Sequence, residues 1–253
     1  MESTLPVFEL VIVVVSLACG GILKGATGAG APLLAVPALV AFHDVRFAIV
    51  IMTVPNLITN AMQMWQNRQH HLRANFLVPF LLSAAIGVTL GTWALVGLDS
   101  RTLSLVVALA VVLYLVLRLT KSNWRLSAPL ALRLAAVFGF ISGVVQGSAG
   151  ISAPVSLSFL NAMGLDRQSF MNTTSMLFVT FASVQLPALA FTGVLTPLGF
   201  LLSCVALLPM LMGMSFGTFI ARKISREVFD RLVMLLLAGL AAKMLWEALI
   251  PAG

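Results

Sequence analysis

The chain has 253 residues, of which 60% are hydrophobic and 9% are charged, and its mean hydropathy is +1.07. Soluble domains carry about 25% charged residues, so this composition excludes a soluble enzyme, a nucleic-acid-binding protein and a disordered chain. It indicates an integral membrane protein, in which the formal net charge of +7 needs a membrane explanation.

Charged and turn residues divide the chain into ten apolar segments. In chain order these are 5–23, 29–42, 47–65, 76–98, 103–119, 130–145, 151–163, 170–192, 198–220 and 232–250. A bilayer core of about 30 Å needs about 20 helical residues, so most segments are long enough to span it. The segments at 29–42 and 151–163 each reach only about 20 Å and are too short.

The two short segments occupy matching places in an internal duplication. Six residues recur at an offset of 122, as the pairs Gly21/Gly143, Gly25/Gly147, Gly28/Gly150, Pro32/Pro154, Asp44/Asp166 and Gln63/Gln185. This nearly constant offset predicts two repeats, 1–122 and 123–253, within one membrane domain. Five segments per repeat is an odd number, so the second repeat starts on the opposite face. We expect an all-α polytopic protein with an inverted repeat and ten transmembrane segments, or eight if each short pair forms a re-entrant hairpin.

Loop charges predict the orientation, because Lys and Arg in short loops are retained on the cytoplasmic side. With alternating faces, one face holds eleven bases against three acids, and the other holds three bases against five acids. The eleven bases are Arg68, Arg73, Arg118, Lys121, Arg125, Arg133, Arg167, Arg222, Lys223, Arg226 and Arg231. The first face is therefore expected to be cytoplasmic, with both termini outside.

A glycine-rich stretch from Gly20 to Pro32 leads into the first short segment, and a second, from Gln146 to Pro154, leads into the other. Closely spaced glycines are expected to break the helix and bring backbone N–H groups together. The helix that follows offers its positive N-terminal end to an anion. Close helix packing is the alternative role for such glycines, but two copies in matching places favour binding loops.

Lys24 is the only base inside these stretches. A lysine at membrane depth is costly and usually faces a cavity or a charged ligand, so we predict that Lys24 attracts an anion. The alternative is that its side chain extends to the cytoplasmic surface. Its repeat partner, Gln146, is neutral, so the two halves of the site are expected to be chemically unequal.

The third segment carries a polar stripe on one face. It consists of Asn56, Thr59, Asn60 and Gln63, which are spaced three and four residues apart. We expect this stripe to face the bundle interior, for substrate contact or for interhelical hydrogen bonding. In the second half the polarity is displaced to 172–175. The complete set of predicted substrate-binding residues is Lys24, Gly25, Thr27, Gly28, Gly30, Asn56, Asn60, Gln63, Gln146, Gly147, Ser148, Gly150, Ser152, Asn172 and Gln185.

Catalytic and metal-binding patterns are absent from the sequence. All eight carboxylates lie at segment ends or in loops, so no buried acid is expected to relay protons or to bind sodium. His43, His70 and His71 also lie in loops, without a third ligand at metal spacing. We predict no catalytic centre, metal or cofactor. The expected partners are a small anion and the lipid bilayer, not nucleic acid, and a homo-oligomer is left open.

Two motifs, KGATGAGAP at 24–32 and QGSAGISAP at 146–154, are each followed by an aspartate about a dozen residues on, Asp44 and Asp166. Together they resemble the sulfite exporter TauE/SafE family over essentially the whole chain. One departure is Ser152, which stands where the first motif has Gly30 and makes that turn less permissive. The resemblance implies transport of sulfite, sulfonates, thiol acids or other small anions across the bacterial inner membrane. In that membrane, the orientation expected from the loop charges places both termini in the periplasm.

We therefore expect an inner-membrane transporter, specifically an exporter of small sulfur-containing or organic anions, and not an enzyme. The binding site is expected between the two glycine-rich stretches. An anion channel is the nearest alternative, because buried carboxylates are missing. A membrane-embedded enzyme or assembly factor is the alternative from a different class.

Overall fold

The protein is all-helical in a computed structural model that describes residues 7–120, 125–220, 223 and 226–249. The helices are α1 (Val7–Thr27), α2 (Ala31–Val40), α3 (Val45–Gln66), the 3₁₀-helix η1 (Arg68–His70), α4 (Ala74–Gly97), α5 (Ser100–Leu119), α6 (Ala128–Ala149), α7 (Ala153–Ala162), α8 (Arg167–Phe191), α9 (Pro197–Ile220) and α10 (Arg226–Leu249). Each of the ten segments expected from the sequence corresponds to one α-helix. The predicted repeat boundary at 122/123 lies outside the described residues, as do the expected cytoplasmic bases Lys121 and Arg222.

Seven of the described helices are long and apolar enough to cross a membrane: α1, α3, α4, α5, α6, α8 and α9. The protein is therefore a multi-pass membrane protein, as its composition predicts. Helices α2 and α7 have 10 residues each and are too short, which confirms the two short segments. Helix α10 has charged residues near both ends and is not one of the seven.

The glycine-rich stretches interrupt the helices later than expected. Helix α1 continues through Gly20, Gly21 and Gly25 and ends only at Thr27. In the turn that follows, Gly28 and Gly30 have φ values of 82° and 86°, in the left-handed region that glycine adopts without strain. An unpaired backbone group costs several kcal/mol in a bilayer. Keeping these glycines helical pairs their backbone groups, which explains why α1 does not end at the first of them.

The second interruption has a different backbone. Gly150 has a φ of 72°, but Ser152 has a φ of −99°, which any residue can adopt. One left-handed position suffices here, whereas the first turn needs two. This difference explains why a serine replaces the second glycine, and it shows that the two turns are not conformationally equivalent.

Helices α6 and α7 form a hairpin whose two ends lie on the same side. The backbone N–H of Leu126, just before α6, donates to the carbonyl oxygen of Ala162 at the end of α7, at 2.8 Å. Stacked rings hold α7 in place, since the centroids of Phe159 and Phe138 on α6 are 4.4 Å apart. In the first half, α1 and α2 also pack together, and a Cβ at Gly20 would meet Ala35.

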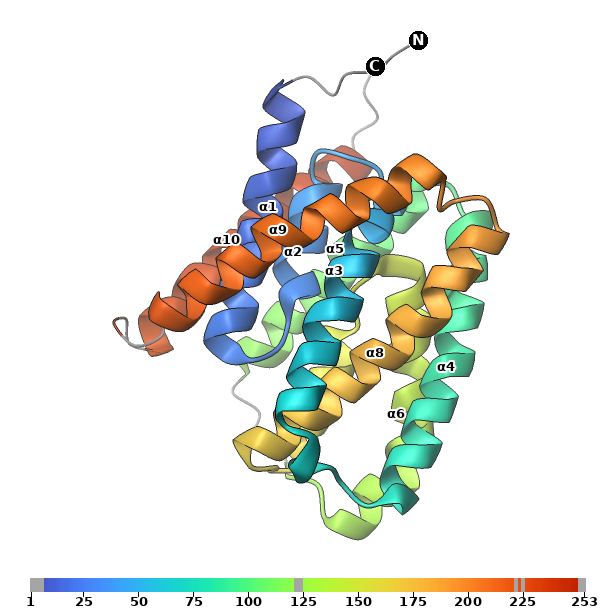
Figure 1. Cartoon of the computed structure of the whole chain (residues 1–253), viewed down its shortest axis with the longest axis vertical. Coiled ribbons are helices and arrows are strands. Elements are labelled where there is room, and N and C mark those ends of the chain that lie inside the picture. The colour runs from blue at the N-terminus through green and yellow to red at the C-terminus, as the bar shows by residue number, and fades with distance from the viewer. Residues whose placement is uncertain (1–6, 121–124, 221–222, 224–225, 250–253) are drawn as a thin grey trace.

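Glycines bring the helices of the two halves into backbone contact. Helix α9 crosses α1 and α4 runs beside α6 (Figure 1). A Cβ at Gly21 or Gly25 on α1 would collide with the backbone of Met210 or Met214 on α9. On α6, a Cβ at Gly147 would collide with the backbone of α4. Small residues allow this close approach of membrane helices.

Aspartates cap three helices at their N-termini. Asp44 accepts a hydrogen bond from the backbone N–H of Arg46 at the start of α3, and Asp99 does so from Thr102 at the start of α5. Asp166 accepts from two backbone N–H groups at the start of α8. These side chains satisfy N–H groups that the first helical turn leaves unpaired.

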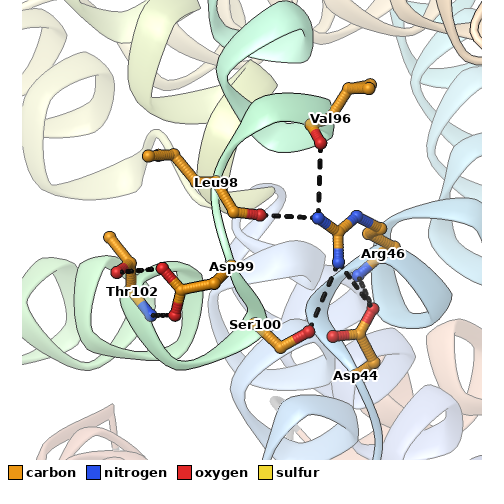
Figure 2. Close-up of polar contacts among 7 residues, drawn as sticks. All are labelled: Asp44, Arg46, Val96, Leu98, Asp99, Ser100 and Thr102. Carbon is orange, nitrogen blue, oxygen red and sulfur yellow. Dashed lines mark hydrogen bonds and ion pairs between the residues drawn. The ribbon is translucent and has the colours of Figure 1, made fainter.

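Arg46 links the start of α3 to the connection between α4 and α5 (Figure 2). Its guanidinium donates to the carbonyl oxygen of Leu98 at 2.6 Å and to Ser100 Oγ at 3.3 Å, and it lies 3.9 Å from Asp44 Oδ2. The last carbonyl groups of a helix have no N–H partner within the helix. Arg46 supplies hydrogen bonds to such carbonyls at the end of α4.

Candidate substrate site

Lys24 lies in the last turn of α1 and is 2% exposed, the one buried charged side chain in the described parts of the chain. Its Nζ donates to Asn60 Oδ1 on α3 at 2.5 Å. The three ion pairs found among the described residues do not include it. A cation near a helix C-terminus is favoured by the helix dipole, but Lys24 has no carboxylate partner in this part of the protein.

The polar stripe of α3 faces the interior, as its spacing predicts, and all four of its residues are buried. Asn60 Nδ2 donates to the backbone oxygen and to Oδ1 of Asn56, both at 2.7 Å. Gln63 Nε2 donates to the carbonyl oxygen of Gly28 at 2.6 Å. The stripe therefore connects Lys24 with the α1–α2 turn.

Helix α8 supplies the opposite wall, where the end of α3 meets the start of α8. Ser175 Oγ donates to Gln63 Oε1 at 3.0 Å, and Asn172 Nδ2 donates to the backbone oxygen of Met64 at 3.2 Å. The displaced polarity at 172–175 thus lies against the polar half of α3. It is a complementary partner of the first stripe and not a copy at an equivalent position.

A small cavity lies beyond Asn56, between α2, α3, α6 and α8. Its polar lining consists of Thr53, Asn56, Gln146 and Gln185, with Gly150 at the second interruption. It has room for about one water molecule. Asn56 therefore contacts Asn60, the partner of Lys24, and also lines this cavity. Residues from both halves of the chain meet here.

The two glutamines of the cavity use their amide nitrogens on backbone carbonyls. Gln146 Nε2 donates to the oxygen of Gly150, and Gln185 Nε2 donates to the oxygen of Gly147, each at 3.2 Å. Gln146 Oε1 is buried and has no hydrogen-bond partner within the described residues. The second interruption thus presents an acceptor oxygen, where the first presents a lysine.

Several other predicted site residues pack against neighbouring helices or form hydrogen bonds within the protein. Gly25 and Gly147 lie in helix–helix contacts. Thr27 donates to the carbonyl oxygens of Leu23 and Ala29, and Ser148 donates to that of Val144. Ser152 accepts from Ser156, while a Cβ at Gly30 would make only ordinary contacts. A ligand contact for these residues stays a prediction.

Three further residues contact the cluster, its turn or the cavity and are not in the predicted set. Thr53 lines the cavity, Ser175 bonds Gln63, and Met171 on α8 lies against Gly28. Thr53 precedes Asn56 by three residues, so the spacing of the stripe could have indicated it. Ser175 belongs to the displaced polar stretch at 172–175, whereas the contact of Met171 depends on the packing of α8 against α1, for which the sequence carries no local signal. Among the described residues no group of three His, Cys, Asp or Glu could hold a metal ion.

The helices, their interruptions and the buried polar residues define the class of protein: a multi-pass, all-helical membrane protein with a buried polar cluster beside broken helices, an arrangement found in many secondary transporters. The chain belongs to the sulfite exporter TauE/SafE family, whose model matches residues 12–244. This match confirms the family that the two glycine-rich motifs indicated. No curated protein and no solved structure matches the chain.

Proposed function

We propose that this protein exports a small sulfur-containing or organic anion, such as sulfite, a sulfonate or a thiol acid, across the bacterial inner membrane. The substrate binds beside Lys24, in the polar cluster between the two helix interruptions. The observation that carries the proposal is the burial of this lysine without a carboxylate partner among the described residues.

A buried charge is unfavourable unless an opposite charge or a set of hydrogen bonds compensates it. Lys24 has one hydrogen bond, to Asn60, so an anionic ligand supplies the missing charge. The alternative was a side chain that extends to the cytoplasmic surface. An exposure of 2% and a bond toward α3 favour the ligand-binding role over that alternative.

We also propose that the two halves form an inverted repeat, with both termini in the periplasm. In support, the packing is exchanged between the halves, since α1 lies on α9 and the corresponding α6 lies on α4. The glutamines matched by the repeat also have related partners: Gln63 donates to the carbonyl of Gly28 in the first interruption, and Gln185 donates to that of Gly147 in the last turn of α6, just before the second. The excess of bases on one predicted face supports the orientation.

The size of the cavity favours a transporter over an open channel. Room for about one water molecule does not accommodate a sulfonate, so helices around the cavity must move before a substrate of that size can pass. Such movement is the alternating access of secondary transporters. Saturable flux is therefore expected.

Ligand-dependent thermal stabilisation of the purified protein tests this function. Binding to the folded state raises the melting temperature, and a panel of sulfonates, carboxylates, thiol acids and sulfite should contain at least one stabilising anion. Lys24→Gln should remove the effect, and Lys24→Arg should be intermediate because a planar guanidinium replaces a compact ammonium. Equal stabilisation of wild type and Lys24→Gln would place the anion elsewhere.

A further inference from the structure

We infer that the site selects anions with a single negative charge over dianions of similar size. This inference rests on the proposed function, because it concerns the same site and specifies the class of its substrate. It follows from the charge that the described interior supplies and from the hydrogen-bonding groups that it leaves open.

The described interior supplies one positive charge. Lys24 is the one charged side chain among the buried residues, and the other described bases lie in loops or near helix ends. A monoanion beside Lys24 makes a neutral pair. A dianion would keep one uncompensated negative charge in an environment of low dielectric constant, where solvation by water is lost.

The glutamine amides of the cluster offer no free donor for a second charge, and the open hydroxyls on α8, those of Thr173 and Thr174, are neutral. The amide nitrogens of Gln63, Gln146 and Gln185 donate to backbone oxygens in the two interruptions or in the helical turn just before the second. The Ser175 hydroxyl is also engaged, with Gln63 Oε1. Donors that already serve buried carbonyls cannot turn to a ligand without leaving those carbonyls unpaired.

One open group at the cavity is an acceptor. Gln146 Oε1 is buried without a partner in the described residues, and it lines the cavity together with Asn56. A protonated monoanion, such as hydrogensulfite, can donate its hydrogen to this oxygen, whereas the sulfite dianion has no hydrogen to donate. For sulfite, this acceptor therefore discriminates in the same direction as the charge.

The repeat shows which residue sets the charge of the site. Lys24 and Gln146 are matched at the offset of 122, so the neutral glutamine stands where a second lysine would make the two halves equal. Gln146→Lys should therefore bring the interior to two positive charges and shift the preference toward dianions. Gln146→Leu removes the same polar group without adding charge and is the matched control.

The first experiment uses wild-type protein with sulfite, which changes near neutral pH from the hydrogensulfite monoanion to the sulfite dianion. Methanesulfonate stays a monoanion and reports any titration of the protein itself. The affinity for total sulfite relative to methanesulfonate should fall severalfold between mildly acidic and mildly alkaline buffer. A constant ratio would show that the site accepts both charge states and would overturn the inference.

The second experiment compares sulfate with methanesulfonate in wild type, Gln146→Lys and Gln146→Leu. The ratio of the two affinities should move toward sulfate at least tenfold in Gln146→Lys, about 1.4 kcal/mol, and should not do so in Gln146→Leu. An unchanged ratio in a folded Gln146→Lys would contradict the inference and leave the proposed function intact. If Gln146→Lys does not fold, the sulfite measurement decides. If no anion binds to wild type, the proposed function fails, and the inference fails with it.

Discussion

Gly28 is subject to two constraints at once, a left-handed backbone and a tight side-chain contact, and it shares this combination with Gly150. It has a φ of 82°, and a Cβ there would press on the side chain of Met171. Gly164 has a φ of 63° with open space around it. Gly97 also lies in open space, but its φ is not in the left-handed region. The three positions therefore separate backbone strain from local packing.

We predict that Gly164→Ala lowers the free energy of unfolding by about 1–2 kcal/mol, the strain of a left-handed non-glycine residue, and that Gly97→Ala has almost no effect. Gly28→Ala should lower it at least as much as Gly164→Ala. Because Gln63 bonds the Gly28 carbonyl, Gly28→Ala should also weaken anion binding per folded molecule. Unchanged affinity in folded Gly28→Ala would remove this turn from the site.

Asp99 and Asp166 make two helix starts sensitive to acid. Hydrogen bonds from the side chain and the backbone N–H of Thr102 lower the pKa of Asp99, and those from Ser169 and Gln168 lower the pKa of Asp166. A carboxylate with a lowered pKa in the folded state contributes stability above its ordinary pKa and loses it as the pH falls through the lowered value.

The melting temperature of wild type should therefore fall more steeply in acid than that of Asp99→Asn. The asparagine can still cap α5 but does not titrate. Asp99→Ala should be less stable than either one at neutral pH. Parallel acid profiles for wild type and Asp99→Asn would show that the ionised cap contributes nothing to stability.

For single residues, the sequence predicts whether a polar side chain is buried better than it predicts its hydrogen-bond partner. The spacing of Asn56, Asn60 and Gln63 correctly indicated a buried stripe, and Lys24 is buried, as its position at membrane depth suggested. The bond from Ser175 to Gln63 was not predictable. It joins residues 112 positions apart, and only the packing of two helices brings them together.

The kink-prone part of α3 depends on a residue from another helix. Pro55 has no N–H, so the carbonyl of Ile51, four residues earlier, has no partner in its own helix. Ser203 on α9 donates to this oxygen at 3.0 Å and accepts from the N–H of Val54 at 3.1 Å. Ser203 is fully buried, so water does not replace the bond.

We predict that Ser203→Ala lowers the free energy of unfolding by about 1–3 kcal/mol, the effect of leaving buried polar groups unpaired. The loss should be smaller in the Pro55→Ala background, where residue 55 can donate to Ile51. Ser142→Ala is the control, because the Ser142 hydroxyl is buried without a partner in the described residues. Equal losses in both backgrounds of the double-mutant cycle would refute the link to Pro55.

The glycines show a limit in predicting helix ends from sequence. Their density indicated two interruptions, which lie toward the end of each glycine-rich stretch, but Gly21 and Gly25 belong to a helix that packs on α9. Both uses of glycine, a turn and a close contact, leave the same pattern in a sequence. Which use applies depends on whether another helix lies within reach, and that is a property of the folded protein.

For the whole molecule, composition and the internal duplication predicted an all-helical multi-pass protein with two short helices. The contacts of α9 on α1 and of α4 on α6 could not be predicted, because each joins segments far apart in the chain. The proposed orientation can be tested with single cysteines in a background that lacks Cys19 and Cys204. A third suitable position, Ser122, lies outside the described residues.

A cysteine at Gln69, in the exposed 3₁₀-helix η1, should be protected from an impermeant thiol reagent applied outside intact cells. A cysteine at Asp99, exposed at the start of α5, should be labelled. Both results follow from the excess of bases on one predicted face. Labelling at Gln69 from outside would reverse the orientation and contradict periplasmic termini.

Flux measured in liposomes tests the central claim, anion transport through the Lys24 site, most directly. Purified wild type, Lys24→Gln and Gly97→Ala are reconstituted, and the movement of sulfite or methanesulfonate across the bilayer is followed at increasing concentration. Saturable flux in wild type and Gly97→Ala, with a large loss in folded Lys24→Gln, is the predicted result. Flux in Lys24→Gln equal to wild type, or wild-type flux no greater than in liposomes without protein, would contradict it.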